Sequence, residues 1–322
     1  MNLILRIAAS TLGLWLAAAA HAQPAGGTIR LIVPFPPGQG ADTIMRLVAE
    51  RLAPRLGQAV VIDNRPGAGG TVGTEFAAKQ PPDGLTLLMG ASGPLAISPT
   101  LQPSAARYNP VRDFEPVTGV ASVAQVFVVA AGAPYRALQD IVRAAREQPE
   151  KIAYGSSGNG TTQHLFVEQF ADLAGVRLLH VPYKGSAPAL VDLIGGQVAM
   201  VSDTIPAMLP HIRAGKVRAL GVTAERRSAF LPDVPTIAEQ GVRGYAAEGW
   251  ITIVAPAGTP GPLADRLDGE IRKVLAEPDL RQKLADMGFV EMTVSRAALR
   301  SFIGAELAKW KKVIETAKIK VE

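Results

Sequence analysis

A proline- and glycine-rich loop, residues 34–42 with the sequence PFPPGQGAD, lies between an apolar segment and an amphipathic one. Gly38 and Gly40 would let the backbone approach a ligand closely. The helix expected to begin here presents unpaired N–H groups at the positive end of its dipole, which suits a carboxylate. Asp42 falls in the first helical turn, where its side chain could order these N–H groups. The loop is therefore interpreted either as an anion-binding site or as a rigid proline–glycine turn.

A second loop, residues 154–164 with the sequence YGSSGNGTTQH, combines glycines with hydroxyl side chains. Such residues form concave sites in which N–H and O–H groups face an anion. The segment is similar to the G-x-S-x-G elbow of hydrolases, but Asn159 stands where the second glycine should be. Since the sequence offers no Asp or His partner for Ser157, anion binding is favoured over hydrolysis. His164 falls within the expected helix and is interpreted as packed or hydrogen-bonded rather than as a base.

Residues 64–73, NRPGAGGTVG, partly match the G-x-G-x-x-G fingerprint of dinucleotide-binding proteins. Gly67 and Gly69 fit the pattern, but Val72 stands at the third glycine position and Gly73 comes one residue later. No acidic residue closes a following strand in the expected way. We therefore favour a structural turn with backbone donors, and we expect no cofactor.

A fourth candidate is the acidic residue Asp203, which follows the apolar run 198–201. A carboxylate at the end of a strand could pair with the ammonium of a ligand or hold an ordered water. It could equally cap the helix expected to begin near Ile205. The sequence leaves these three roles open.

Composition excludes several other classes of site. The chain has no cysteine, so disulfides, thiolate nucleophiles and cysteine metal sites are excluded. The four histidines are scattered without metal-ligand spacing, and no metal is expected. The formal net charge of +5 is spread along the chain without a Lys/Arg block, so no nucleic-acid partner is expected.

The elements that must position these loops alternate between apolar β-branched runs and helical patterns, which predicts parallel sheets covered by helices. The expected strands are 29–33, 59–62, 85–89, 125–130, 152–154, 178–181, 198–202, 217–223 and 250–255; the expected helices are 41–56, 71–79, 138–147, 161–174, 186–194, 205–214, 262–275, 278–287 and 296–317. Two such α/β sets predict two lobes, with crossings near 120–125 and 248–253. In open α/β sheets, ligands bind beyond the carboxyl ends of the strands, where these loops would lie.

The first 22 residues, Met1 to Ala22, have the pattern of a cleavable secretory signal. Arg6 gives a basic start, residues 7–20 are apolar, and Ala20-His21-Ala22 is a small-x-small cleavage pattern. The apolar run is shorter than the about 20 residues that a membrane span needs. We expect export, cleavage after Ala22 and a soluble mature chain in the periplasm.

Several motifs in order along the mature chain resemble the Bug family, the substrate-binding proteins of tripartite tricarboxylate transporters. The segments that carry this resemblance are IRLIVPFPPGQGAD (29–42), VVIDNRPGAGGTVG (60–73), PPDGLTLLMG (81–90), KIAYGSSGNGTTQHL (151–165), HVPYKG (180–185), GGQVAMVSD (195–203), IRAGKVRALGVT (212–223) and VAPAGTP (254–260). The resemblance implies an α/β, type II periplasmic-binding-protein fold, in which two lobes with mostly parallel sheets close around a ligand cleft. It places lobe 1 at 23–123 plus 252–322 and lobe 2 at 124–251.

The resemblance also implies a ligand site that is built mainly from the first two loops. These would bracket a carboxylate with backbone N–H groups, hydroxyls and ordered waters, while Ser92 and Asp203 lie where family members vary their selectivity contacts. The family pattern has two adjacent glycines where this chain has Gly38-Gln39; Gln39 would be strained if the position requires φ > 0, and its amide could reach the ligand. The candidate residues are Phe35, Pro37, Gly38, Gln39, Gly40, Asp42, Ser92, Ser156, Ser157, Asn159, Thr161, Thr162 and Asp203.

The function expected from this resemblance is binding without turnover: a monomeric receptor captures a small carboxylate or amino acid and delivers it to membrane permease subunits. Two alternatives stay open at this point. One is an exported hydrolase that uses Ser157, and the other is a ligand-sensing receptor that docks on a signalling partner.

Overall fold

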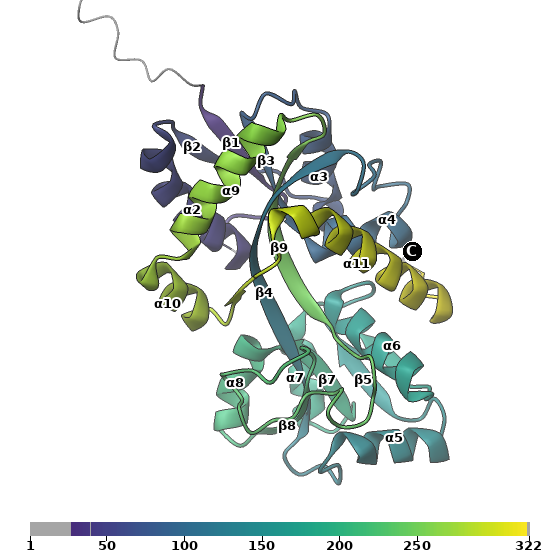
Figure 1. The fold of residues 1–322 in the computed structure, drawn as a ribbon. Coiled ribbons are helices and arrows are strands. Elements are labelled where there is room, and N and C mark those ends of the chain that lie inside the picture. Colours follow the sequence, from purple (N-terminus) through teal and green to yellow (C-terminus); the bar gives the residue numbers. More distant parts are fainter. Residues whose placement is uncertain (1–26, 39, 321–322) are drawn as a thin grey trace, which may run out of the picture.

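Two long strands, β4 (Phe114–Ala130) and β9 (Glu248–Pro256), run between two α/β lobes in the computed structural model (Figure 1). The structure describes residues 27–38 and 40–320, so the expected signal peptide and Gln39 lie outside the described residues. The strand order is β2-β1-β3-β9-β4-β7-β5-β6, with β8 and β10 also paired to β4. In the described part of the chain, no helix is long and apolar enough to cross a membrane.

Lobe 1 is built on β1 (Ile29–Val33), which pairs in parallel with β2 (Val60–Asn64) and β3 (Thr86–Ala91). Alternate residues of β1 enter different cores, because successive side chains of a strand point to opposite faces. Leu31 joins a core with the helices α2 (Gly40–Leu56) and α9 (Gly261–Leu275), whereas Ile32 joins the core on the other face. The remaining helical elements here are η2 (Ala68–Gly70), α3 (Thr71–Ala78), η3 (Gly93–Ile97), α4 (Ser98–Leu101) and α10 (Pro278–Asp286).

Lobe 2 repeats the parallel arrangement with β5 (Ala153–Ser156), which lies between β6 (Leu179–Pro182) and β7 (Met200–Thr204). Its helices are α5 (Leu138–Glu147), α6 (Thr162–Ala174), α7 (Ser186–Ile194) and α8 (Ile205–Arg213), and its last strand is β8 (Val217–Val222). Apart from β4, which begins 11 residues before the expected strand 125–130, the expected helices and strands are present with boundaries within two residues, and α5 and α7 match at both ends. The α/β fold class is thereby confirmed.

The two lobes share β4, which the sequence analysis recognised only over 125–130. Residues 114–124 of this strand pair antiparallel with β9, and residues 125–130 pair antiparallel with β7 and β8. The short strand β10 (Val290–Glu291) pairs with β4 at Ser122 and Ala121. The change of partners between Ala124 and Gln125 coincides with the expected lobe crossing, although the lobe boundaries themselves stay a prediction.

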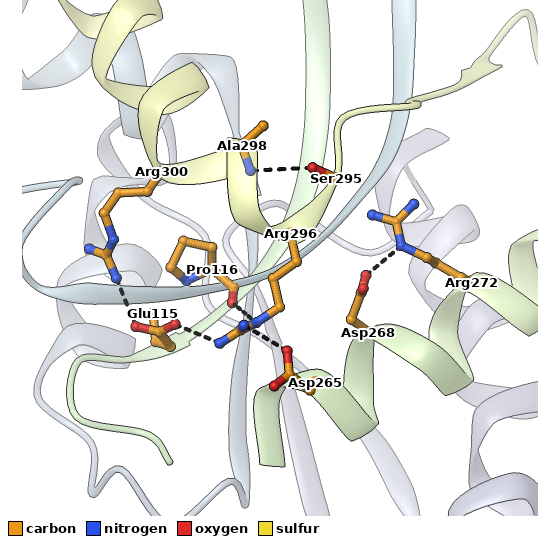
Figure 2. A network of polar contacts seen from close by, with 9 residues as sticks. All are labelled: Glu115, Pro116, Asp265, Asp268, Arg272, Ser295, Arg296, Ala298 and Arg300. Carbon is orange, nitrogen blue, oxygen red and sulfur yellow. Dashed lines mark hydrogen bonds and ion pairs between the residues drawn. The ribbon is translucent and has the colours of Figure 1, made fainter. Parts of the chain in front are cut away.

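The C-terminal helix α11 (Arg296–Thr316) lies against both lobes (Figure 1). At its first turns, Arg296 and Arg300 both bind the carboxylate of Glu115 on β4, at 2.8 and 2.7 Å, and Arg296 also binds Asp265 on α9 at 2.7 Å (Figure 2). Near its other end, the fully buried Trp310 stacks on Phe166 of α6, with ring centroids 5.2 Å apart. Helix α11 therefore packs against α6 of lobe 2 as well as against lobe 1.

Candidate functional site

The first loop owes its shape to the buried carboxylate of Asp42, which is only 1% exposed. Its Oδ2 accepts hydrogen bonds from the N–H of Gly38 and from Nε of Arg46, both at 2.9 Å, and its Oδ1 accepts one from Nδ2 of Asn64 at 2.8 Å. Burial alone would raise the pKa of Asp42, but these hydrogen bonds outweigh it and hold the pKa below its usual value. Asp42 thus orders the loop, as expected, and its oxygens are used by the chain.

The rest of this loop, at the carboxyl end of β1, is mostly exposed to solvent. Pro37, Gly38 and Gly40 are exposed, Phe35 is partly buried, and Gly38 has φ +85°, where a side chain would be strained. Asn64 also donates a hydrogen bond to the carbonyl of Phe35 at 3.1 Å, which fixes the start of the loop. Gln39, the expected departure from the family pattern, lies outside the described residues.

The neighbouring loop 64–73 packs against the first one. A Cβ on Gly73 would meet the carbonyl oxygen of Arg65 at 2.6 Å and Cα of Pro34 at 3.0 Å, and a Cβ on Gly70 would lie 3.5 Å from the ring of Phe35. These glycines therefore allow the two loops to pack closely together.

Ser92 directly precedes η3, after the carboxyl end of β3. It is buried, and its hydroxyl makes no hydrogen bond with the described residues. Its Oγ lies 4.0 Å from the position that a Cβ on Gly249 of β9 would occupy. Ser92 thus lies beside the strands that connect the lobes.

The second loop is organised from within by Ser156 and Thr161. The Oγ of Ser156, which is fully buried, accepts a hydrogen bond from the N–H of Gly158 at 3.1 Å and lies 2.6 Å from Nε2 of His180. Thr161 caps α6, since its Oγ1 accepts a bond from the N–H of His164, and it donates to the carbonyl of Gly158 at 2.8 Å. Both hydroxyls therefore shape the loop.

Ser157 is partly exposed and Asn159 is exposed, and neither side chain bonds to the described residues. They are the free polar groups of the second loop. The serine–histidine contact in this region involves Ser156, which is fully buried, and not Ser157. Among the described residues, Ser157 has no partner that could activate it as a nucleophile.

Two stacked histidines support the second loop. The rings of His164 and His180 lie 3.7 Å apart with an interplanar angle of 13°, and Nδ1 of His164 accepts a hydrogen bond from the N–H of Gly160 at 3.1 Å. Burial, together with the neighbouring His180, lowers the pKa of His164 to about 3, and burial lowers the pKa of His180 to about 4. Both rings are therefore neutral at pH 7. The packed, hydrogen-bonded role expected for His164 is confirmed, whereas the contact with His180 was missed.

A line of hydrogen bonds connects the remaining candidates of lobe 2. The hydroxyl of Ser202 donates to Oε1 of Gln125 at 2.6 Å, and Nε2 of Gln125 donates to Oγ1 of Thr162 at 2.9 Å. Thr162 donates to Oε1 of Gln163 at 3.1 Å, and Nε2 of Gln163 donates to Oδ1 of Asp203 at 3.2 Å. Gln125, on the strand shared by the lobes, was not among the expected site residues.

The register of the strands brings both sets of candidates toward the middle of β4. In lobe 1, Ala91 at the end of β3 pairs with Ile251, which in turn pairs with Ala121 of β4. In lobe 2, Thr204 at the end of β7 pairs with Gln125. The loops after β1, β3, β5 and β7 therefore lie at strand ends near the junction of the lobes. In the described residues, no hydrogen bond joins the first loop to lobe 2, and no group of acidic residues and histidines could hold a metal ion.

Two α/β lobes joined by crossing strands, with glycine- and hydroxyl-rich loops at the carboxyl ends of their sheets, define the architecture of a solute-binding protein. A family model described as "Tripartite tricarboxylate transporter family receptor" matches residues 44–319. The protein BugT of Bordetella pertussis is 35% identical over 320 residues, covering 97% of this chain and 98% of BugT. The chain belongs to this receptor family, as its resemblance to the Bug proteins predicted.

Solved structures of related binding proteins are also similar to this chain. Rpa4515 of R. palustris with adipate is 37% identical and has a TM-score of 0.75, covering 92% of this chain and 99% of that one. MatC of Rhodopseudomonas palustris with bound malate is 30% identical with a TM-score of 0.72, covering 90% and 99%. A TctC solute-binding protein from Polaromonas without ligand is 26% identical with a TM-score of 0.82, covering 91% and 100%. The periplasmic-binding-protein fold is thereby confirmed.

Proposed function

We propose that this protein is a periplasmic receptor that binds one small carboxylate-bearing ligand between its lobes, as a monomer, and delivers it to the permease of a tripartite tricarboxylate-type transporter. The observation that carries the proposal is the convergence of loops rich in glycine and hydroxyl groups from both lobes on the middle of β4. The ligands of two related structures, adipate and malate, are both dicarboxylates.

Binding is proposed to close the lobes around the ligand by bending near residues 124–125 of β4. The TM-score is 0.82 with the ligand-free relative and 0.72 and 0.75 with the two ligand complexes, although the ligand-free relative has the lowest sequence identity of the three. This order supports a conformation of the present structure that is more similar to the ligand-free relative than to the two complexes. Closure would desolvate the carboxylate and replace its water with N–H and O–H donors, which offsets the cost of burying it.

In this proposal some candidate residues contact the ligand, and others hold the binding loops in shape. Asp42 and Ser156 hold the loops in shape, because their polar atoms are already bonded within the chain. The hydroxyls of Thr161 and Thr162 are likewise bonded within lobe 2 and are proposed to support the site. The proposed contacts to the ligand come from Phe35, Pro37, Gly38, Gln39, Gly40, Ser92, Ser157, Asn159 and Asp203.

The test is a thermal-shift screen of the purified mature protein with mono-, di- and tricarboxylates and with amino acids. A ligand that binds only the folded state stabilises it by RT ln(1 + [L]/Kd), which is about 2.7 kcal/mol at 100 times Kd. Ser157→Asp places a negative charge in the second loop and should abolish the shift through like-charge repulsion. The matched control, Ser301→Asp on the exposed side of α11, should leave it unchanged.

The alternatives predict different outcomes. A hydrolase would consume an ester or amide, and Ser157→Ala would stop that consumption; we expect saturable binding with the ligand recovered intact. A signalling receptor would bind the ligand equally well without supporting uptake. Uptake of labelled ligand by vesicles that carry the permease, measured with and without this protein, distinguishes the two roles. A complete lack of stabilisation by small anions would refute the binding proposal.

A further inference from the structure

Asp203 is a buried carboxylate whose charge has no cationic partner. The residue is 3% exposed, and within the described residues it forms no salt bridge with Lys, Arg or His. Its Oδ1 accepts hydrogen bonds from the N–H of Thr204 at 2.7 Å and from Nε2 of Gln163 at 3.2 Å. Its Oδ2 accepts none from the described chain. Oδ2 is not among the buried side-chain atoms that lack a partner, so this oxygen keeps access to the space beside it. Removing it from water on lobe closure would be costly unless a partner compensates its charge.

The helix-capping role does not account for Asp203. Helix α8 begins at Ile205 with Thr204 as its N-cap, and no side chain caps it within the described residues. The hydrogen bond from Thr204 joins Asp203 to its own neighbour, and the one from Gln163 is long. Asp203 could be replaced by a neutral acceptor such as Asn and still provide for both donors, so these contacts do not require its charge.

The hydrogen bonds among the described residues around Asp203 supply donors to Oδ1 but none to Oδ2. The hydroxyl protons of Ser202 and Thr162 are directed to amide oxygens of Gln125 and Gln163, and only the amide of Gln163 reaches the carboxylate. The line consists of neutral groups, so it orients Asp203 without neutralising it. What would satisfy Oδ2 is a further donor, preferably one that carries positive charge.

Asp203 also lies close to the proposed carboxylate loop. Its partner Gln163 is in the first turn of α6, two residues after Thr161, the residue that caps this helix and closes the second loop. Strands β5 and β7 run parallel, so Ser156 and Asp203 are both at the carboxyl edge of the lobe 2 sheet. A ligand whose carboxylate occupies the second loop would therefore lie at the same edge of the sheet as Asp203.

We propose that Oδ2 of Asp203 binds the ammonium group of the ligand, and that the ligand is therefore an amino acid rather than a simple carboxylate. This inference rests on the proposed function, since it presupposes that the second loop holds a carboxylate. The ammonium supplies the positive charge that the buried Asp203 lacks, and Asp203 replaces part of the water that the ammonium loses on closure.

The experiment is calorimetric titration of the mature protein at pH 7.5 with matched triplets that differ in one substituent: propionate, lactate and alanine; succinate, malate and aspartate; glutarate, 2-hydroxyglutarate and glutamate. In the triplet whose length fits, the amino member should bind about 10- to 100-fold more tightly than the other two, the range of a hydrogen bond to a charged group. This comparison needs no variant.

Asp203→Asn then tests the residue. We expect it to remove most of the preference for the amino member, so that the affinities for the amino acid and for the unsubstituted acid differ by less than about threefold. Asp172→Asn, on the exposed face of α6, is the matched control and should keep the preference. An equal or stronger affinity for the unsubstituted or hydroxy acid in the wild type overturns the inference, as does a preference that survives in Asp203→Asn. If no carboxylate of any kind binds, the proposed function itself fails.

Discussion

Replacing Asp42 by Asn should destabilise the first loop, because the buried Oδ2 accepts two of the three hydrogen bonds that hold the loop together. An asparagine keeps the shape of the side chain but offers one oxygen in place of two. Whichever way its amide is oriented, at least one donor among Gly38, Arg46 and Asn64 then faces an NH₂ group. Hydrogen bonds to charged groups contribute about 1.5–3 kcal/mol each, and an unsatisfied buried donor costs about 1–3 kcal/mol. Because Arg46 is half exposed and can turn to water, we expect a loss of about 2–4 kcal/mol in the free energy of unfolding.

The measurement is urea unfolding at pH 7.5 of the wild type, Asp42→Asn and the control Asp233→Asn, an exposed carboxylate without a hydrogen bond to the described chain. The pKa of Asp42 is lowered by folding, so its contribution is present above the pKa of the unfolded chain and is lost as pH falls through the lower folded value. The stability difference between wild type and Asp42→Asn should therefore shrink toward pH 3. A difference below about 0.5 kcal/mol at pH 7.5, the range of ordinary surface substitutions, would refute the account of the loop given above.

Two further predictions concern the histidine pair and the contact between the lobes. His164 has a pKa of about 3 when folded and about 6.5 when unfolded, so protonation favours the unfolded state and the free energy of unfolding falls as pH decreases below about 6.5. Between pH 7 and 5, the free energy of unfolding of His164→Gln, measured by urea titration, should therefore fall by about 2 kcal/mol less than that of the wild type. Equal decreases in the two proteins would show that folding does not hold the ring neutral. Gly288 has φ +75°, and a Cβ there would lie 1.8 Å from Cγ of Pro206 in lobe 2. Gly288→Ala should therefore lower the free energy of unfolding by about 1–3 kcal/mol and increase the radius of gyration of the unliganded protein in small-angle scattering. The control Gly304→Ala, whose Cβ would meet only Val111 at 3.8 Å, should change neither quantity.

Most of the fold could be predicted from the sequence because its periodicity is strong in the elements that have one face buried. Helix α5 places Leu138, Ile141 and Val142 on one stripe, and its boundaries were predicted correctly. The first part of β4 could not be recognised in this way. Residues 114–124, FEPVTGVASVA, contain a proline, a glycine and several small residues, and most of them are buried whichever face they are on, so polar and apolar residues do not alternate.

The site was predictable only where it depends on local chemistry. Loops that are rich in glycine and follow strands can be located from the sequence, and the ordering role of Asp42 follows from its place in the first turn of α2. The contacts of His180 and Gln125 could not be located, because they depend on which strands pair and in what register. The clue for His180 is available only once β5 and β6 are known to be neighbours, since Tyr154 and His180 then lie directly opposite each other.

The path of the chain through the lobes has a consequence for the order of folding. The sheet of lobe 1 needs β9 beside β3, so this lobe depends on segments far apart in the sequence, and α11 completes a core that both lobes share. Most elements of lobe 2, from α5 to β8, are contiguous in sequence. The sheet of lobe 2 can therefore begin to form while the chain is still emerging, whereas the sheet of lobe 1 must wait for β9 and the shared core must wait for α11. We expect a protein truncated before Arg296 to retain structure in lobe 2 and to lose the cooperative unfolding of the whole, because the helix that joins the cores would be missing.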